Sequence, residues 1–179
     1  MNRVHARVRV LVFYAPIMVC LSATGAFAHG VMREPASRAI GAPNEDYQYC
    51  FGTPGCECGE FPAAGGIVST YKSGQSIDVT IDVTQSHATN TVFRFQLCPP
   101  DQCSPDCFVA GEFASVSFDQ TLGLHTYRID LPVGVVCDPC VLRWKWDYGF
   151  LSCADVSIVA REVGLEAPTA WAALKAMYR

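Results

Sequence analysis

Apolar and polar residues alternate along several short segments in the middle and C-terminal parts of the chain. The clearest case is 77–83, where Ile and Val alternate with Asp and Thr. A period of two is typical of a strand with one face in the core and the other in solvent. The same pattern recurs in weaker form in segments 91–98, 114–118, 125–131, 141–147 and 154–160. The pattern therefore predicts six or seven strands.

The connections between these segments decide the fold class. They are short and rich in Gly and Pro, a turn is expected at 71–75, and no long helical period separates the strands. This favours an all-β fold, an antiparallel β-sandwich of the immunoglobulin or fibronectin-III-like type. Residues 31–65 show neither period and are expected to form a long loop region tied by disulfides. Trp171, Leu174 and Met177, at three-residue spacing, predict a short C-terminal helix.

The first 28 residues have the layout of a secretory signal peptide. Basic residues precede an apolar run from about residue 10 to 21, and an Ala-x-Ala sequence ends at Ala28. A membrane anchor would need about 20 apolar residues, and a lipoprotein signal at Cys20 would need small residues before it. We therefore expect cleavage after Ala28 and secretion to the extracellular space.

Cleavage divides the chain into a signal peptide at 1–28, a single domain at 29–161 and a tail at 162–179. The remaining 151 of the 179 residues are enough for one domain with a core of its own. They carry ten basic and 17 acidic residues, a formal charge of −7. An acidic surface argues against nucleic acid and anionic membranes as partners, but not against a neutral polysaccharide.

Nine cysteines remain after the signal, and in an exported chain they predict a disulfide framework. They are Cys50, Cys56, Cys58, Cys98, Cys103, Cys107, Cys137, Cys140 and Cys153. The number is odd, so one thiol is expected to be free or paired between molecules. Cys137 and Cys140 could instead form a redox pair. A zinc site at Cys56 and Cys58 is disfavoured because no histidine lies near them.

Cleavage after Ala28 would leave His29 with a free α-amine. Its amine and its imidazole could chelate one metal ion, and a second imidazole would complete a site with three nitrogen ligands. Such a set suits copper, and an α-amine pKa near ~8 allows metal binding at neutral pH. His87 is the expected partner because it follows a predicted strand in a loop. His125, at the start of a strand, is the alternative.

Several ordered motifs from residue 29 to about 160 resemble a known family. They begin with His29-Gly30-Val31-Met32 and Pro35-Ala36-Ser37-Arg38, followed by Cys56-x-Cys58-Gly59-Glu60, Tyr71-Lys72-x-Gly74-Gln75 and Val83-Thr84-x-x-His87. Phe93-Arg94-Phe95-x-Leu97-Cys98-Pro99, Leu142-Arg143-Trp144 and Cys153-Ala154-Asp155-Val156 complete the set. The chain resembles the lytic polysaccharide monooxygenases, and most closely auxiliary activity family 15, which acts on chitin and cellulose.

The resemblance implies a set of site residues. His29 and His87 would hold one copper ion as a histidine brace. Phe150, five residues before Asp155, would occupy the axial side, with Tyr148 as the alternative. Gln85 and Asp147 are the candidates for polar groups beside the copper. Tyr47, Tyr49 and Phe51 are candidates for substrate contacts, unless they pack against the disulfides.

The resemblance also implies an activity: oxidative cleavage of glycosidic bonds in an insoluble polysaccharide, chitin or cellulose. It would need an external electron donor and O2 or hydrogen peroxide, and we expect a monomer without a membrane partner after cleavage. The alternatives are a secreted copper-binding or polysaccharide-binding protein without this activity, and a purely structural cysteine-rich domain. Hydrolysis by paired carboxylates is disfavoured because the spacing of Glu60, Asp147 and Asp155 indicates no pair.

Overall fold

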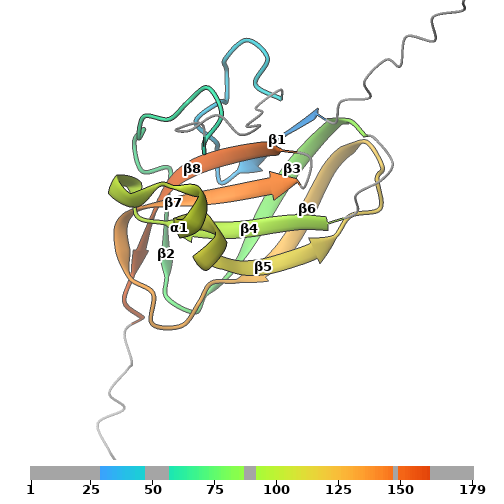
Figure 1. Cartoon of the computed structure of the whole chain (residues 1–179). Coiled ribbons are helices and arrows are strands. Elements are labelled where there is room, and N and C mark those ends of the chain that lie inside the picture. Colours follow the sequence, from blue (N-terminus) through green and yellow to red (C-terminus); the bar gives the residue numbers. More distant parts are fainter. Residues whose placement is uncertain (1–28, 47–56, 87–91, 147–148, 162–179) are drawn as a thin grey trace, which may run out of the picture.

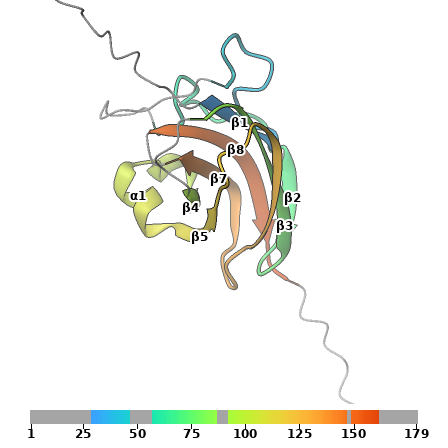
Figure 2. The same ribbon diagram turned by 90° about the vertical axis from the view of Figure 1, so that its right-hand side faces the viewer.

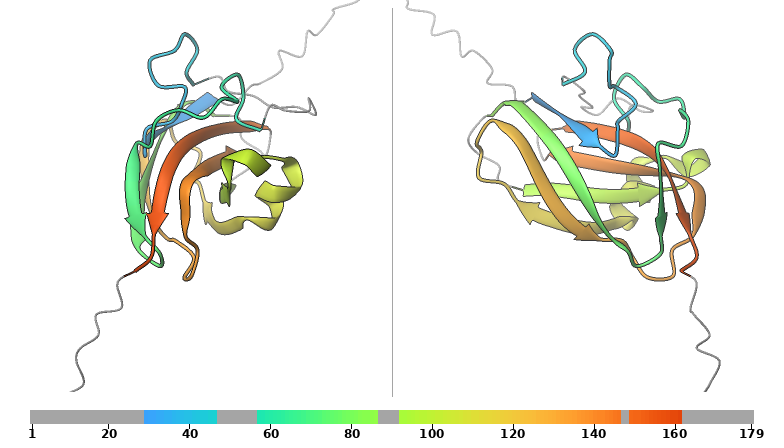
Figure 3. Two further views of the ribbon diagram at one scale, coloured as in Figure 1. Left: turned by 90° about the vertical axis from the view of Figure 1, so that its left-hand side faces the viewer. Right: turned by 180° about the vertical axis from the view of Figure 1, so that it is seen from behind.

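The computed structural model describes residues 29–46, 57–86, 92–146 and 149–161, which form two β-sheets packed face to face (Figure 1). The smaller sheet has the order β1-β3-β6 and is antiparallel throughout. Its strands are β1 (His29–Glu34), β3 (Ser76–Gln85) and β6 (Gly123–Asp130), and they face the viewer in the right panel of Figure 3.

The larger sheet has the order β2-β8-β7-β4-β5. Its strands are β2 (Ser69–Lys72), β4 (Val92–Cys98), β5 (Glu112–Ser117), β7 (Cys137–Trp146) and β8 (Phe150–Val159). β2 runs parallel to β8, and the other pairs are antiparallel. The mainly β, mainly antiparallel prediction is confirmed, with this one parallel pair as the exception. The immunoglobulin or fibronectin-III-like assignment stays a prediction.

The core lies between the two sheets and follows the predicted alternation. In β3 the four Ile and Val side chains are buried, while the Asp and Thr side chains between them are more accessible. From the other sheet, Phe93 packs edge-on against Trp144 and Trp146 and stacks on Phe118. Buried aromatic side chains contribute most to such a core because each removes a large apolar area from water.

β8 is covered on both faces, since every residue from Phe150 to Ile158 is buried. Ala154, Val156 and Ile158 face the core between the sheets. Cys153 belongs to a second apolar cluster on the outer side, together with Phe108 of α1 (Pro105–Ala110). Figure 2 shows α1 on this outer side of the larger sheet, far from β3. Cys58, from the long loop region, belongs to the same outer cluster, so this region also packs on the outer face of the larger sheet.

Two predictions about local structure were wrong. Residues 31–34 were expected in a loop, but they belong to β1, in which Gly30, Val31 and Met32 are all buried. A strand buried on both faces shows no alternation to detect. The turn expected at 71–75 is limited to 73–75, because Tyr71 and Lys72 pair with β8. The short helices α1 and η1 (Pro100–Gln102) were not predicted.

The disulfide framework is present, with three bridges among the described residues: Cys58–Cys153, Cys98–Cys107 and Cys137–Cys140. Cys103 is the one free cysteine in this part of the chain. With Cys58 in a disulfide, the zinc alternative loses one of its two thiolates. Cys50 and Cys56 lie outside the described residues, as do the signal peptide and the C-terminal helix. No described helix is both long and apolar enough to span a bilayer.

Candidate functional site

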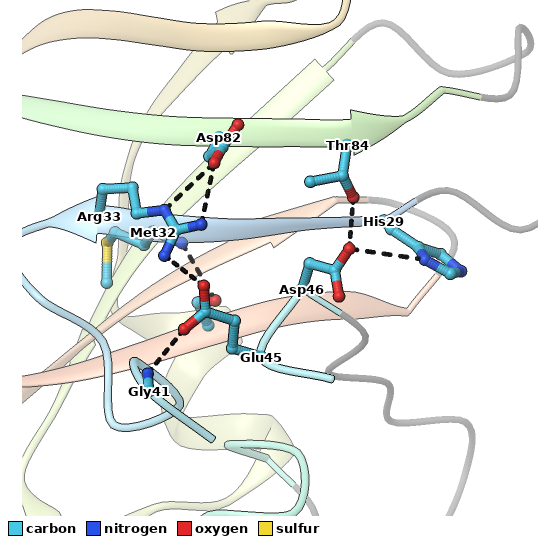
Figure 4. A network of polar contacts seen from close by, with 9 residues as sticks. His29, Met32, Arg33, Gly41, Glu45, Asp46, Asp82 and Thr84 are labelled. Carbon is cyan, nitrogen blue, oxygen red and sulfur yellow. Dashed lines mark hydrogen bonds and ion pairs between the residues drawn. The ribbon is translucent and has the colours of Figure 1, made fainter. Parts of the chain in front are cut away.

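The candidate site lies where β1 and β8 begin and β3 ends, at one edge of the sandwich (Figure 4). The antiparallel register pairs the Cα of His29 with that of Gln85. The His29 imidazole is partly exposed, and its ring centroid lies 5.9 Å from that of Phe150. The structure therefore brings together three of the predicted residues, His29, Gln85 and Phe150. The first and the last of them are 121 positions apart in the sequence.

Gly30 explains how the start of β1 can lie so close to its neighbours. A Cβ atom at this position would be 3.1 Å from the main-chain oxygen of Asp82 and 3.2 Å from the indole of Trp144. Both contacts are tighter than ordinary packing allows. The absence of a side chain therefore lets β1 approach β3 and the core, and this fixes the backbone next to His29.

Phe150 is placed by the hairpin between β7 and β8. Its Cα pairs with that of Trp146, and Gly149 closes the turn with a φ of 94° and an N–H···O bond of 3.0 Å to the Trp146 carbonyl. Glycine adopts this left-handed conformation without steric cost. Phe150 is 1% exposed, and its ring forms an apolar surface beside the His29 imidazole. Its predicted position on the axial side of a copper ion stays a prediction.

Asp46 is the site residue that sequence reasoning missed. One of its carboxylate oxygens, Oδ2, lies 3.9 Å from Nδ1 of His29 and accepts a hydrogen bond of 2.6 Å from the Thr84 hydroxyl. Its main-chain oxygen accepts a bond of 2.9 Å from the N–H of Gly30. Figure 4 shows the His29 and Thr84 side chains directed at the same carboxylate.

A polar network holds the segment that carries Asp46 (Figure 4). Arg33 of β1 donates to Asp82 of β3 at 2.9 and 3.2 Å, and also to Glu45. Glu45 accepts a further bond of 2.6 Å from the N–H of Gly41. The Gly41 N–H and Arg33 together lower the pKa of Glu45. Burial alone would lower the pKa of Arg33, but its two acidic partners raise it. The ion pairs are thus favourable and fix residues 41–46 against the strands.

A second polar cluster lies behind the site, on the outer face of β8. Asp155 accepts two bonds from Arg38, at 2.6 and 2.8 Å, and one of 2.7 Å from the N–H of Gly65. Arg38 also donates to the carbonyls of Phe61 and Pro62. Burial raises the pKa of Asp155, but these bonds outweigh it and the net shift is downward. Asp155 thus holds the loop, and this use argues against it as a hydrolytic acid.

The remaining predicted site residues lie either inside or outside the described part of the chain, and Gln85 and His125 lie inside it. Gln85 is exposed at the end of β3, opposite His29. His125 pairs with Ile81, four residues before Gln85, and its Nε2 lies 2.9 Å from the carbonyl of Thr121. His87, Asp147, Tyr148, Tyr47, Tyr49 and Phe51 lie outside the described residues. Within the described ranges, no group of three or more His, Cys, Asp or Glu residues could hold a metal.

Comparison with known proteins agrees with the motifs. Residues 56–156, more than half of the chain, match the sequence profile of a family described as lytic polysaccharide mono-oxygenase, cellulose-degrading. No curated protein matches the sequence. A lytic polysaccharide monooxygenase of auxiliary activity family 15 from Thermobia domestica, solved in the Cu(I) state, has a similar fold. It is 23% identical, with a TM-score of 0.58 over 73% of this chain and 99% of that one.

A chitin binding domain from Burkholderia pseudomallei also shares the fold. It is 13% identical, with a TM-score of 0.54, and the alignment covers 74% of this chain and 100% of that one. At these identities the two structures establish the fold, whereas the sequence profile establishes the family. The chain belongs to the lytic polysaccharide monooxygenase family, and its fold is like that of auxiliary activity family 15.

Proposed function

We propose that the mature protein begins at His29 and is a copper-dependent enzyme that cleaves glycosidic bonds oxidatively. The observation that carries the proposal is the position of His29. It lies at the first residue of β1, opposite Gln85 and beside the Phe150 ring. His87 follows Gln85 by two residues, and two residues span at most about 7 Å. Chain connectivity is therefore compatible with a site shared by the two imidazoles.

The donor set fits copper. An α-amine and two imidazoles would supply three nitrogen ligands, the ligand type that divalent copper favours. The His29 side chain is 25% exposed, so its ring is accessible from solvent. Phe150 offers no donor atom, which would leave one side of the ion without a protein ligand. The nearby Asp46 carboxylate adds a favourable charge for a cation.

Bound copper would supply the redox chemistry, with an external electron donor and O2 or hydrogen peroxide as co-substrates. The protein's own residues would bind the ion and shape its surroundings. His29 and His87 would bind the ion. Phe150 would exclude water from one side, because its ring is buried and apolar. Gly30 would keep the first residue of the mature chain at a fixed place in the sheet.

The proposed substrate class is an insoluble, neutral polysaccharide, chitin or cellulose. The family description names cellulose, and a protein of the same fold is described as a chitin binding domain. An acidic mature chain of charge −7 is compatible with an uncharged substrate. Tyr47, Tyr49 and Phe51 remain the candidates for contacts with it. The proposal includes a secreted protein with a signal peptide at 1–28 and the catalytic domain at 29–161.

The test uses the secreted protein, with its N-terminal residue identified by mass spectrometry. The copper-loaded chain is incubated with chitin or cellulose, ascorbate and hydrogen peroxide. We expect oxidised oligosaccharides from at least one substrate. Tight copper binding without oxidised products would favour the alternative of a binding protein. A chain that begins at another residue would overturn the proposal.

Three variants make the test specific. His29→Ala should lose copper binding and activity. A chain with one extra glycine before His29 keeps every imidazole but displaces the amine, so it should also bind copper much more weakly. His125→Ala is the matched control and should leave copper affinity unchanged, because His125 lies in β6 and its Nε2 contacts the carbonyl of Thr121, just before that strand.

A further inference from the structure

Asp46 places a carboxylate beside the residue that would be the first copper ligand. We propose that Asp46, positioned by Thr84, raises the affinity of the site for divalent copper, and raises it more than the affinity for monovalent copper. This inference rests on the proposed function, since it concerns the same site. Asp46 belongs neither to the family motifs nor to the predicted ligand set, and Thr84, although it lies in one of the motifs, was given no role at the metal.

The position of Asp46 is fixed by contacts to two different strands. Its main-chain oxygen accepts a bond from Gly30 in β1, and its side chain accepts one from Thr84 in β3. The preceding residue, Glu45, is bonded to Arg33, which is itself bonded to Asp82. A carboxylate held from both sides cannot turn away from His29 without breaking at least one of these bonds.

The contacts of Asp46 leave its charge available to a cation. Thr84 is a neutral donor, and the hydrogen bond orients the carboxylate without adding a positive charge. Arg33, in the same strand as His29, is already bonded to Glu45 and Asp82. The distance of 3.9 Å between Oδ2 and Nδ1 of His29 exceeds that of a hydrogen bond. This geometry fits electrostatic attraction toward an ion held by Nδ1.

The size of the effect can be bounded from general principles. Groups that lie just outside the ligands of a metal site change its affinity about 10–100-fold when they are replaced. Coulomb attraction is proportional to the charge of the ion. Loss of the carboxylate should therefore weaken divalent copper more than monovalent copper. The Asp46→Asn variant should consequently be easier to reduce than the wild type.

The experiment measures copper affinity in the mature protein by competition with chelators, separately for Cu(II) and Cu(I). Asp46→Asn should weaken Cu(II) binding at least tenfold and Cu(I) binding by a smaller factor. Thr84→Val should weaken Cu(II) binding several-fold. Asp78→Asn is the matched control, because Asp78 is exposed near the other end of β3 and should have no effect. Electron paramagnetic resonance of the Cu(II) forms provides a second readout.

The outcomes separate this inference from the proposed function. If His29→Ala abolishes Cu(II) binding and Asp46→Asn binds within twofold of the wild type, the role of Asp46 is refuted and the copper site stands. If His29→Ala binds copper like the wild type, the proposed function itself fails. Melting curves in the presence of a chelator check folding. If Asp46→Asn does not fold, the Cu(II) affinity of Thr84→Val is the test instead. An unchanged Cu(II) affinity in that variant would refute the proposal.

Discussion

The buried ion pair between Arg38 and Asp155 offers the sharpest test of how the loop region is held. The two side chains are 6% and 1% exposed, and the pair has two hydrogen bonds. Replacing Asp155 by Asn keeps the size of the side chain but removes the charge. It leaves the Arg38 guanidinium buried without a counter-ion. Breaking a buried pair in this way costs about 3–5 kcal/mol of unfolding free energy.

This cost can be converted into a melting temperature. For a domain of this size, 1 kcal/mol corresponds to about 2–4 °C, so Asp155→Asn should lower the melting temperature by about 6–20 °C. The matched control is Asp78→Asn. Its partner Arg128 lies 3.8 Å away, and the two side chains are 72% and 56% exposed. Exposed pairs contribute little, so the control should change the unfolding free energy by less than about 0.5 kcal/mol.

The effect should also depend on pH in a defined direction. The pKa of Asp155 is lowered in the folded protein, so in acid the unfolded chain binds more protons at this residue. Stabilisation by the pair is therefore complete above the ordinary carboxyl pKa, near ~4, and is lost as the pH falls through the folded value. Denaturant melts of both proteins at several pH values measure this difference. A variant whose free energy of unfolding at pH 7 lies within 1 kcal/mol of the wild type would refute the reasoning.

Two further predictions concern the backbone and the loop. Gly30→Ala should cost about 1–3 kcal/mol, because the new Cβ would meet the main chain of Asp82 and the indole of Trp144, and it should weaken copper binding. Calorimetry and a copper titration check this, and full stability with unchanged affinity would contradict it. Replacing both Cys58 and Cys153 by Ala opens a loop with a sequence separation of 95 and should cost about 2–5 kcal/mol in equilibrium unfolding. A loss below 1 kcal/mol would show that the other contacts hold the loop by themselves.

The sequence predicts those parts of the fold in which one face of a strand is buried and the other is exposed. β3 is the best example, since its alternation gave both the strand and its inward face. β1 and β8 are covered on both sides, so their patterns contain continuous buried runs. β8 was accordingly predicted only from residue 154, and β1 was not predicted. The six residues of α1 are too few to establish a helical period.

The residues of the candidate site were likewise predictable only where a local signal in the sequence marks them. His29 and Phe150 were found from a cleavage site and from motif spacing, which are local signals, and the structure places their rings side by side. Asp46 lies 17 positions after His29, in a segment without any period. It is held near His29 by its bonds to Gly30 and Thr84, and by the bond between Glu45 and Arg33. No local pattern encodes such a contact, which depends on hydrogen bonds and ion pairs between segments that are distant in the sequence.

β8 links the stability of the loop region to the geometry of the candidate site. Phe150 contacts His29, Ser152 accepts a bond from the N–H of Met32 in β1, and Asp155 holds Arg38. One strand thus contacts both the first residues of β1 and the loop behind them. A change at Asp155 is expected to lower stability and, through β8, to loosen the site. A change at Asp46 is expected to alter metal affinity with little loss of stability, since its bonds lie at a partly exposed edge. Measuring both quantities in both variants therefore separates a residue that supports the fold from one that acts on the metal.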